Sequence, residues 1–167
     1  MVAELAAQIS TRTKGRLDVL VNNAGIIYTI PAVDADISQT RKLFDVNVFG
    51  PMLMVHYLHR QIIAAQGRVI NVSSIAGVSP YVYGSVYNAS KAALVHFMDT
   101  LRVEMTPLGV KVINIISGEV QTDILRHDRE RSLPPDSVYF PLNDEFRAHC
   151  LRTPPSECPI IDLVGRY

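Results

Sequence analysis

Tyr87 and Lys91 stand four residues apart, a spacing that puts a phenol and an ammonium group on one face of a helix, one turn from each other. A phenol ordinarily loses its proton only near a pKa of about 10. A cation roughly 4 Å away, at an effective dielectric constant near 20, favours the phenolate by about 4 kcal/mol, or about three pKa units at most. The pair therefore predicts a tyrosine that works as an acid or a base near neutral pH.

Such a pair also occurs by chance in many helices, so its meaning depends on the chain around it. Ser74 precedes Tyr87 by thirteen residues, and Asn47 lies further upstream. In order, the neighbouring motifs are LDVLVNNAG at 17–25, DVNV at 45–48, GRVINVSSIAG at 67–77, VYNASKAA at 86–93, GVKVIN at 109–114 and SGEVQT at 117–122. This order and spacing resembles the short-chain dehydrogenase/reductase family, whose members move hydride between NAD(P) and a carbonyl or an alcohol.

The resemblance implies a role for four side chains. Tyr87 would protonate the alkoxide that forms as hydride reaches the carbonyl carbon, while Lys91 would lower the pKa of Tyr87 and hydrogen-bond the nicotinamide ribose. Ser74 would donate a hydrogen bond to the substrate carbonyl oxygen, and the spacing to Tyr87 favours it over its neighbour Ser73. Asn47 resembles an asparagine that holds a proton-relaying water; a purely structural asparagine is the alternative.

The resemblance also implies a set of cofactor contacts. Asn23, Ala24 and Gly25 follow an apolar strand, where glycine permits close approach to a flat ring. By resemblance Asn23 lines the adenosine side of the cofactor, and Tyr87 and Lys91 touch the cofactor as well. Two later residues, Val120 and Thr122, match positions that contact the nicotinamide carboxamide. A serine, Ser117, stands where the family usually has a proline before this loop.

A narrower resemblance concerns the substrate. The run PYVYGSVYNASK at 80–91, with TLRVE at 100–104 and LPPDSVY at 133–139, is similar to fungal NADPH-dependent 1-acyldihydroxyacetone-phosphate reductases and to reductases of fungal secondary metabolism. This likeness implies NADPH in preference to NADH and a lipid-like or polyketide-like ketone. It also implies a cytoplasmic protein, with peripheral association with the endoplasmic reticulum or lipid droplets in the lipid branch.

Composition excludes several other classes. Sixteen basic residues balance sixteen acidic ones, so no net field attracts nucleic acid or an anionic membrane surface. No apolar run approaches the length of a membrane span. The only cysteines, Cys150 and Cys158, form no disulfide framework. His56 and His59 have a spacing that could hold a metal, but no third ligand is evident, so no metal is expected.

Hydrophobic periodicity gives the elements that position these residues. The sequence predicts a helix over 2–13, a strand over 17–24, and a long helix over 39–65, capped by Ser38 and kinked at Gly50-Pro51. Further predicted elements are a strand over 68–73, a helix over 85–105 and a strand over 111–116. This alternation predicts an α/β fold, a partial Rossmann-like doubly wound parallel sheet that corresponds to the fourth to sixth strands of the family.

The glycine-rich turn that holds the cofactor pyrophosphate in this family is not found, since no subset of the nine glycines has its spacing. We therefore expect an N-terminally truncated catalytic domain over 1–126, a substrate-side irregular segment over 127–149 and an atypical tail over 150–167. Such a chain would bind NADPH poorly. A non-catalytic remnant or dimerisation partner is the competing interpretation, and the intact family member is expected to be a homodimer or homotetramer.

Overall fold

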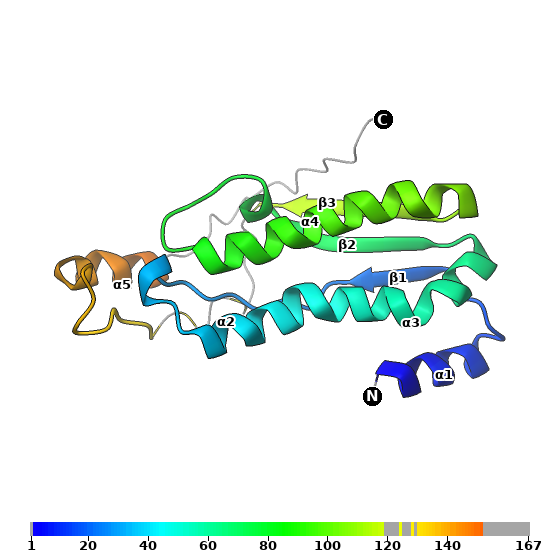
Figure 1. Cartoon of the computed structure of the whole chain (residues 1–167), viewed down its shortest axis with the longest axis horizontal. Coiled ribbons are helices and arrows are strands. Elements are labelled where there is room, and N and C mark those ends of the chain that lie inside the picture. The colour runs from blue at the N-terminus through cyan, green and yellow to red at the C-terminus, as the bar shows by residue number, and fades with distance from the viewer. Residues whose placement is uncertain (1, 119–123, 125–127, 129, 152–167) are drawn as a thin grey trace.

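A computed structural model of the chain describes residues 2–118, 124, 128 and 130–151, and every structural statement below concerns these residues. Three strands form one parallel sheet in the order β1-β2-β3: β1 (Val19–Asn22), β2 (Arg68–Ser74) and β3 (Lys111–Ser117) (Figure 1). The predicted partial Rossmann-like sheet is therefore confirmed, although β1 is shorter than the predicted run over 17–24.

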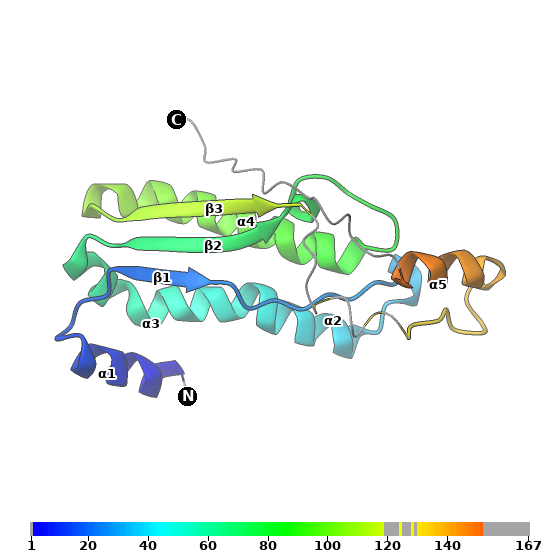
Figure 2. The ribbon, with the colours of Figure 1, turned by 180° about the vertical axis from the view of Figure 1, so that it is seen from behind.

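Two long helices cover one face of the sheet. Figure 2 shows the strands in front of α3 (Gly50–Ala65) and α4 (Ser85–Met105), which lie side by side behind them. The covered face buries Leu20, Val69 and Val112, one residue from each strand in register. On the other face Val21 keeps 53% of its surface exposed. Strict alternation within β1 thus separates a packed face from an open one.

The main core lies between this sheet face and the helices. Its buried members are Ala6, Leu20, Val55, Leu58, Ile62, Val69, Leu94, Met98, Leu101, Met105, Val110 and Val112. The helix α1 (Val2–Arg12) packs against α3 and contributes Ala6 to this core. It ends as predicted, because Gly15 follows with a φ of 76° that ordinary residues avoid.

The predicted long helix over 39–65 is instead two helices joined by a π-helical turn. The helix α2 (Ile37–Phe44) leads into η2 (Asp45–Phe49), and α3 follows. Its cap is Asp36 and not Ser38 as predicted: the Asp36 carboxylate accepts hydrogen bonds from the backbone N–H of Gln39 (2.9 Å) and from the Ser38 hydroxyl (2.5 Å). A carboxylate accepts both donors at once, which explains why it takes the cap.

The sequence predicts a kink at Gly50-Pro51, and the structure has an irregular segment one turn earlier, the π-helical turn η2. A proline in the first turn of α3 has no N–H to donate, so the ladder of hydrogen bonds must be interrupted before it. The turn buries Asn47 and Val48 completely or nearly so. A π-helical turn changes how its residues are placed around the helix axis, and Asn47, a member of this turn, is buried.

Short turns and a second core complete the described chain. The turns are η1 (Ala32–Asp34), η3 (Ile75–Gly77), η4 (Thr106–Leu108) and η6 (Phe140–Leu142), and the last helix is α5 (Asn143–Leu151). Within the predicted irregular segment over 127–149, the described residues 130–149 are partly helical, as predicted, because they contain η6 and most of α5. The second core contains Tyr28, Ile30, Leu43, Ala76, Val86, Tyr87, Leu133, Phe146 and Cys150. No helix in the described part of the chain is both long and apolar enough to cross a bilayer.

Candidate active site

Ser74 and Tyr87 meet at the carboxyl end of the sheet. Ser74 is the last residue of β2, and its Oγ accepts a hydrogen bond from the backbone N–H of Ala76 in η3 (3.1 Å). Tyr87 lies in the first turn of α4, and its side chain is hydrogen-bonded to Ser74. Of the two adjacent serines, the structure thus brings Ser74 to Tyr87. Ser73 is 2% exposed and lies on the buried face of β2 with Val69 and Asn71.

Burial governs the acidity of Tyr87. The side chain is 8% exposed, and its removal from water raises the pKa of the phenol above the ordinary value near 10, because the phenolate is the form that loses hydration. The hydrogen bond with Ser74 acts in the opposite direction and lowers the pKa, since it stabilises the phenolate. Burial is the larger of the two causes, so Tyr87 is a neutral phenol at physiological pH.

Lys91 lies one turn further along α4 and is 5% exposed. Its Nζ is 5.7 Å from the centre of the Tyr87 ring and donates a hydrogen bond to the backbone carbonyl of Val72 in β2 (3.2 Å). Burial lowers the pKa of this ammonium group to about 8. Desolvation disfavours the charged form of a lysine, just as it disfavours the phenolate.

This geometry corrects the prediction that Lys91 lowers the pKa of Tyr87. The prediction assumed a cation about 4 Å from the phenol oxygen, whereas the Lys91 ammonium is directed at the β2 backbone. The Tyr87 pKa is raised, and the causes are burial and the Ser74 hydrogen bond. The two side chains do share a helix face, as their spacing predicts, and burial is the largest cause of the pKa shift of each.

Asn47 joins three segments beneath this pair. Its amide oxygen accepts from the backbone N–H of Ile26 (2.9 Å), and its Nδ2 donates to the Ile26 carbonyl (2.9 Å) and to Ser90 Oγ (3.1 Å). Ser90 in turn donates to the Tyr87 carbonyl (2.7 Å). The fully buried Asn47 therefore fixes the loop after β1 relative to α4. Its water-holding role is a prediction that these bonds do not test.

The predicted cofactor residues divide into three groups. Gly25 lies beside the site, since a Cβ at this position would be 3.5 Å from Asn47 Oδ1 and 3.6 Å from Lys91 Nζ. Asn23 and Ala24 are exposed at the end of β1, where a ligand could reach them. Val120 and Thr122 lie outside the described residues. The structure thus brings together Ser74, Tyr87, Lys91, Asn47 and Gly25.

Ser90 is a residue that sequence reasoning missed. It is fully buried and links Asn47 to the first turn of α4. A small polar residue three positions after Tyr87 and next to Lys91 must lie near the helix face that meets the site, and this spacing was the available signal.

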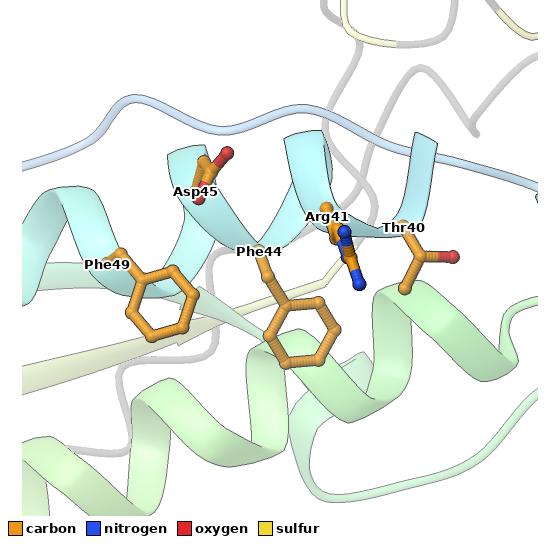
Figure 3. Close-up of a pocket in the computed structure, with 5 residues that line it drawn as sticks. All are labelled: Thr40, Arg41, Phe44, Asp45 and Phe49. Carbon is orange, nitrogen blue, oxygen red and sulfur yellow. The ribbon is translucent and has the colours of Figure 1, made fainter. Parts of the chain in front are cut away.

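A pocket lies elsewhere, on the outer surface of α2 and η2. It is lined by Thr40, Arg41, Phe44, Asp45 and Phe49 (Figure 3). None of the four candidate catalytic side chains lines it, so this hollow and the Tyr87 site are separate features of the described chain.

Comparison with known proteins assigns a family. A family model described as short chain dehydrogenase matches residues 1–133. The chain is 56% identical over 153 residues to the short-chain dehydrogenase srdE of Neurospora crassa, covering 92% of this chain and 53% of that protein. It is 40% identical over 144 residues to the NADPH-dependent 1-acyldihydroxyacetone phosphate reductase of Schizosaccharomyces pombe, covering 84% of this chain and 49% of that protein.

A solved structure with the same architecture is a metagenomic short-chain oxidoreductase in complex with NADP. It is 33% identical, with a TM-score of 0.66 over 72% of this chain and 55% of the other. The chain thus spans about half the length of the curated relatives that it matches.

The lowered pKa of Lys91 leads to a prediction about stability. At pH 7 the lysine is charged in both states, so folding must remove an ammonium group from water; above pH 10.5 it is neutral in both, and this cost is gone. We expect Lys91→Met to be more stable than the wild type at pH 7 by about 1–3 kcal/mol. The upper limit corresponds to the whole pKa shift of Lys91, and the loss of the hydrogen bond to Val72 reduces the gain. The gap should close between pH 8 and 10.5.

Urea unfolding followed by circular dichroism at pH 7 and 10.5 measures this difference. The exposed Lys111→Met is the matched control and should show no such pH dependence. A gap between Lys91→Met and wild type that stays constant across this range would contradict the assignment.

Proposed function

The chain belongs to the short-chain dehydrogenase family, and on that premise we propose that it carries the proton-transferring part of an NADPH-dependent ketone reductase. The observation that supports this most directly is the Ser74–Tyr87 hydrogen bond with Lys91 buried one turn away. We further propose that residues 1–126 form the catalytic domain, 127–149 the substrate side and 150–167 a separate tail.

The proposed reaction adds one hydride and one proton to a ketone to give an alcohol. Bound NADPH supplies the hydride to the carbonyl carbon. Ser74 donates a hydrogen bond to the carbonyl oxygen, on which negative charge develops. Tyr87 gives its phenolic proton to that oxygen, and its raised pKa keeps the proton available at neutral pH. Lys91, with a pKa of about 8, is able to exchange a proton near neutrality and so to help restore the phenol.

The residues beside the pair suit a flat cofactor ring. Gly25 has no side chain between the end of β1 and the Lys91 ammonium, so a ring can approach the backbone there. Asn23 and Ala24 are open to contact at the same edge. NADPH in preference to NADH is supported by the NADP complex of the similar metagenomic protein and by the name of the Schizosaccharomyces pombe reductase.

An aromatic or polyketide-like ketone is the substrate class that we favour over an acyl-dihydroxyacetone phosphate. Tyr87 shares its buried cluster with Tyr28 and Phe146, and Tyr83 packs on Phe146 with ring centres 5.1 Å apart. A phosphate would require a cation, and Arg131, a cation in the described part of this segment, is paired with Asp128. The relative whose name specifies an acyl-dihydroxyacetone phosphate, from Schizosaccharomyces pombe, is 40% identical, against 56% for the Neurospora crassa short-chain dehydrogenase, so identity does not favour the acyl phosphate.

A non-catalytic dimerisation partner is the second candidate, and an exposed apolar stripe supports it. Phe49, Leu53 and Tyr57 recur at helical spacing on η2 and α3 and keep 50%, 43% and 40% of their surfaces exposed. A stripe of this kind on a soluble helix is typical of a protein interface. We propose that this stripe joins two copies of the chain, whether or not the chain is active.

The catalytic proposal predicts that Tyr87→Phe lowers kcat by about 10² to 10⁴, because the proton donor is lost while the ring still fills its place. Ser74→Ala should lower kcat by about 10² to 10³. Ketone reduction is followed by NADPH absorbance, with an aryl ketone and an acyl-dihydroxyacetone phosphate in parallel at saturating NADPH. The exposed Tyr139→Phe is the control. Wild-type turnover in Tyr87→Phe would remove the proposal, and turnover of the acyl phosphate alone would reverse the substrate assignment.

The cofactor proposal predicts weak binding by the 167-residue chain. Its sequence holds no glycine-rich turn for the pyrophosphate, and losing two charge-assisted hydrogen bonds there costs about 3–6 kcal/mol, or about a hundredfold or more in Kd. A fluorescence titration with NADPH, run beside the Neurospora crassa relative, measures the ratio. Equal dissociation constants would show that other residues hold the pyrophosphate.

The dimer proposal predicts that Phe49→Asp together with Tyr57→Asp converts a dimer into a monomer, since charges in an apolar interface must be desolvated. Analytical ultracentrifugation at several protein concentrations measures the mass. Val33→Asp, at a residue that is 71% exposed on η1, should leave the dimer intact. A monomeric wild type would end the proposal.

A further inference from the structure

A buried carboxylate lies outside the candidate active site. Asp128 is 1% exposed, and its Oδ2 accepts hydrogen bonds from the Thr29 hydroxyl (2.5 Å) and from the Thr29 backbone N–H (3.1 Å). Its Oδ1 accepts from Arg131 Nε. A charge removed from water costs several kcal/mol unless it is paired and hydrogen-bonded. The three donor atoms around the Asp128 carboxylate meet that requirement, so the arrangement is specific.

The partner arginine adds a second contact to the same loop. The Arg131 guanidinium lies over the Tyr28 ring, 4.5 Å from its centre, and the Tyr28 hydroxyl accepts from the Asp36 backbone N–H (3.0 Å). Asp128 and Arg131 thus grip two consecutive residues of the loop after β1, although Thr29 and Asp128 are separated by 99 positions in the chain. We call Thr29, Tyr28, Asp128 and Arg131 the clasp.

The loop that the clasp grips also holds two other segments. Ser137 donates to the Asp34 carboxylate (2.6 Å), which ties the chain before η6 to η1. On the opposite side, the Ile30 backbone N–H donates to the carbonyl of Tyr83 (2.8 Å), a residue held at a φ of 61°. The loop over 26–36 therefore connects the turn before α4 with the segment that leads to α5.

The segment that leads to α5, and α5 itself, contribute apolar residues to the buried cluster that contains Tyr87. Leu133 and Phe146 are 2% and 0% exposed and lie in the same buried cluster as Tyr28 and Tyr87. The Leu133 backbone N–H donates to the Asn143 side chain (2.9 Å), which fixes the start of α5 to the residues just after the clasp. A displacement at Asp128 would thus carry Leu133 and Phe146 with it.

We propose that Asp128 is a positioning residue for the ketone: by clasping Thr29 it holds Leu133 and Phe146 against Tyr87 and so forms the substrate wall. The inference rests on the proposed reductase function. Asp128 acts through the segment and not on the reacting atoms, so its loss should weaken ketone binding while the proton transfer from Tyr87 proceeds. A purely structural clasp would alter stability and leave the KM of the folded enzyme unchanged.

Cys150 offers a readout that needs no catalysis. It lies in α5, is 2% exposed, and belongs to the same cluster as Tyr87. Alkylation with iodoacetamide, followed by peptide mass analysis to separate Cys150 from Cys158, measures how often α5 leaves this cluster. Asp128→Asn and Thr29→Val each remove an interaction worth about 1–3 kcal/mol, so Cys150 should react about tenfold faster or more in both.

The same variants are assayed for turnover of an aryl ketone. We expect KM for the ketone to rise about tenfold in Asp128→Asn and Thr29→Val, with kcat changed less than twofold. Thr29→Ser keeps the hydroxyl and should restore both the slow alkylation and the low KM. Glu104→Gln, at an exposed carboxylate of α4 outside the substrate-side segment, is the control and should match the wild type. Circular dichroism confirms that each variant is folded.

The outcomes separate the two proposals. If Cys150 is alkylated at the wild-type rate in Asp128→Asn, the clasp does not hold α5. If alkylation is faster but the KM for the ketone is unchanged, the role of the clasp is structural only. Either result overturns the inference. A wild-type chain that reduces no ketone would end the proposed function instead, while faster alkylation in that case still identifies Asp128 as the anchor of the wall.

Discussion

The burial of Lys91 is the constraint on which the site depends. An ammonium group with 5% exposure must find acceptors within the protein, and Val72 of β2 supplies one. That bond requires α4 to lie close to the sheet, which Gly77 permits. A Cβ at Gly77 would lie 2.9 Å from the Lys91 carbonyl carbon and oxygen, closer than a real Cβ can approach. Any larger residue at Gly77 would push η3 away from α4, and Ser74 with it.

Asparagines extend this constraint across the sheet. Asn22, Asn71 and Asn114 occupy matching positions on β1, β2 and β3. Asn71 donates to Asn114, and Asn114 donates to Asp99 and to the Val95 carbonyl of α4. The Asn71 and Asn114 side chains thus link β2 and β3 to α4 and help to fix its position along the strands, whereas Asn22 Nδ2 and Asn71 Oδ1 are buried without a hydrogen-bond partner in the described part of the chain. Together with the Asn47–Ser90 hydrogen bond, these contacts give α4 polar links near its start and at its middle.

The sequence predicted local features well and distant contacts poorly. The bounds of α4 agree with the prediction because a long amphipathic run ends at a proline. Asp36 replaced Ser38 as the cap because neighbouring candidates compete by geometry that a pattern does not contain. The grouping of Ser74, Tyr87, Lys91 and Asn47 followed from family motifs, whose order encodes a shared fold. The Thr29–Asp128 contact could not be predicted, because neither segment contains a local pattern that indicates a partner 99 positions away.

The error in the predicted pKa of Tyr87 has a general physical cause. Charge attraction falls with distance, while desolvation acts on each group wherever it is buried, so two buried groups of opposite charge both shift toward their neutral forms when they do not touch. The raised pKa of Tyr87 and the lowered pKa of Lys91 thus have the same main cause, which is the burial of each group. For a reductase this is favourable, because the donor must hold its proton until charge develops on the substrate oxygen. In the proposed reaction Ser74 would act twice, because the hydroxyl that donates to the substrate oxygen would also stabilise the phenolate of Tyr87.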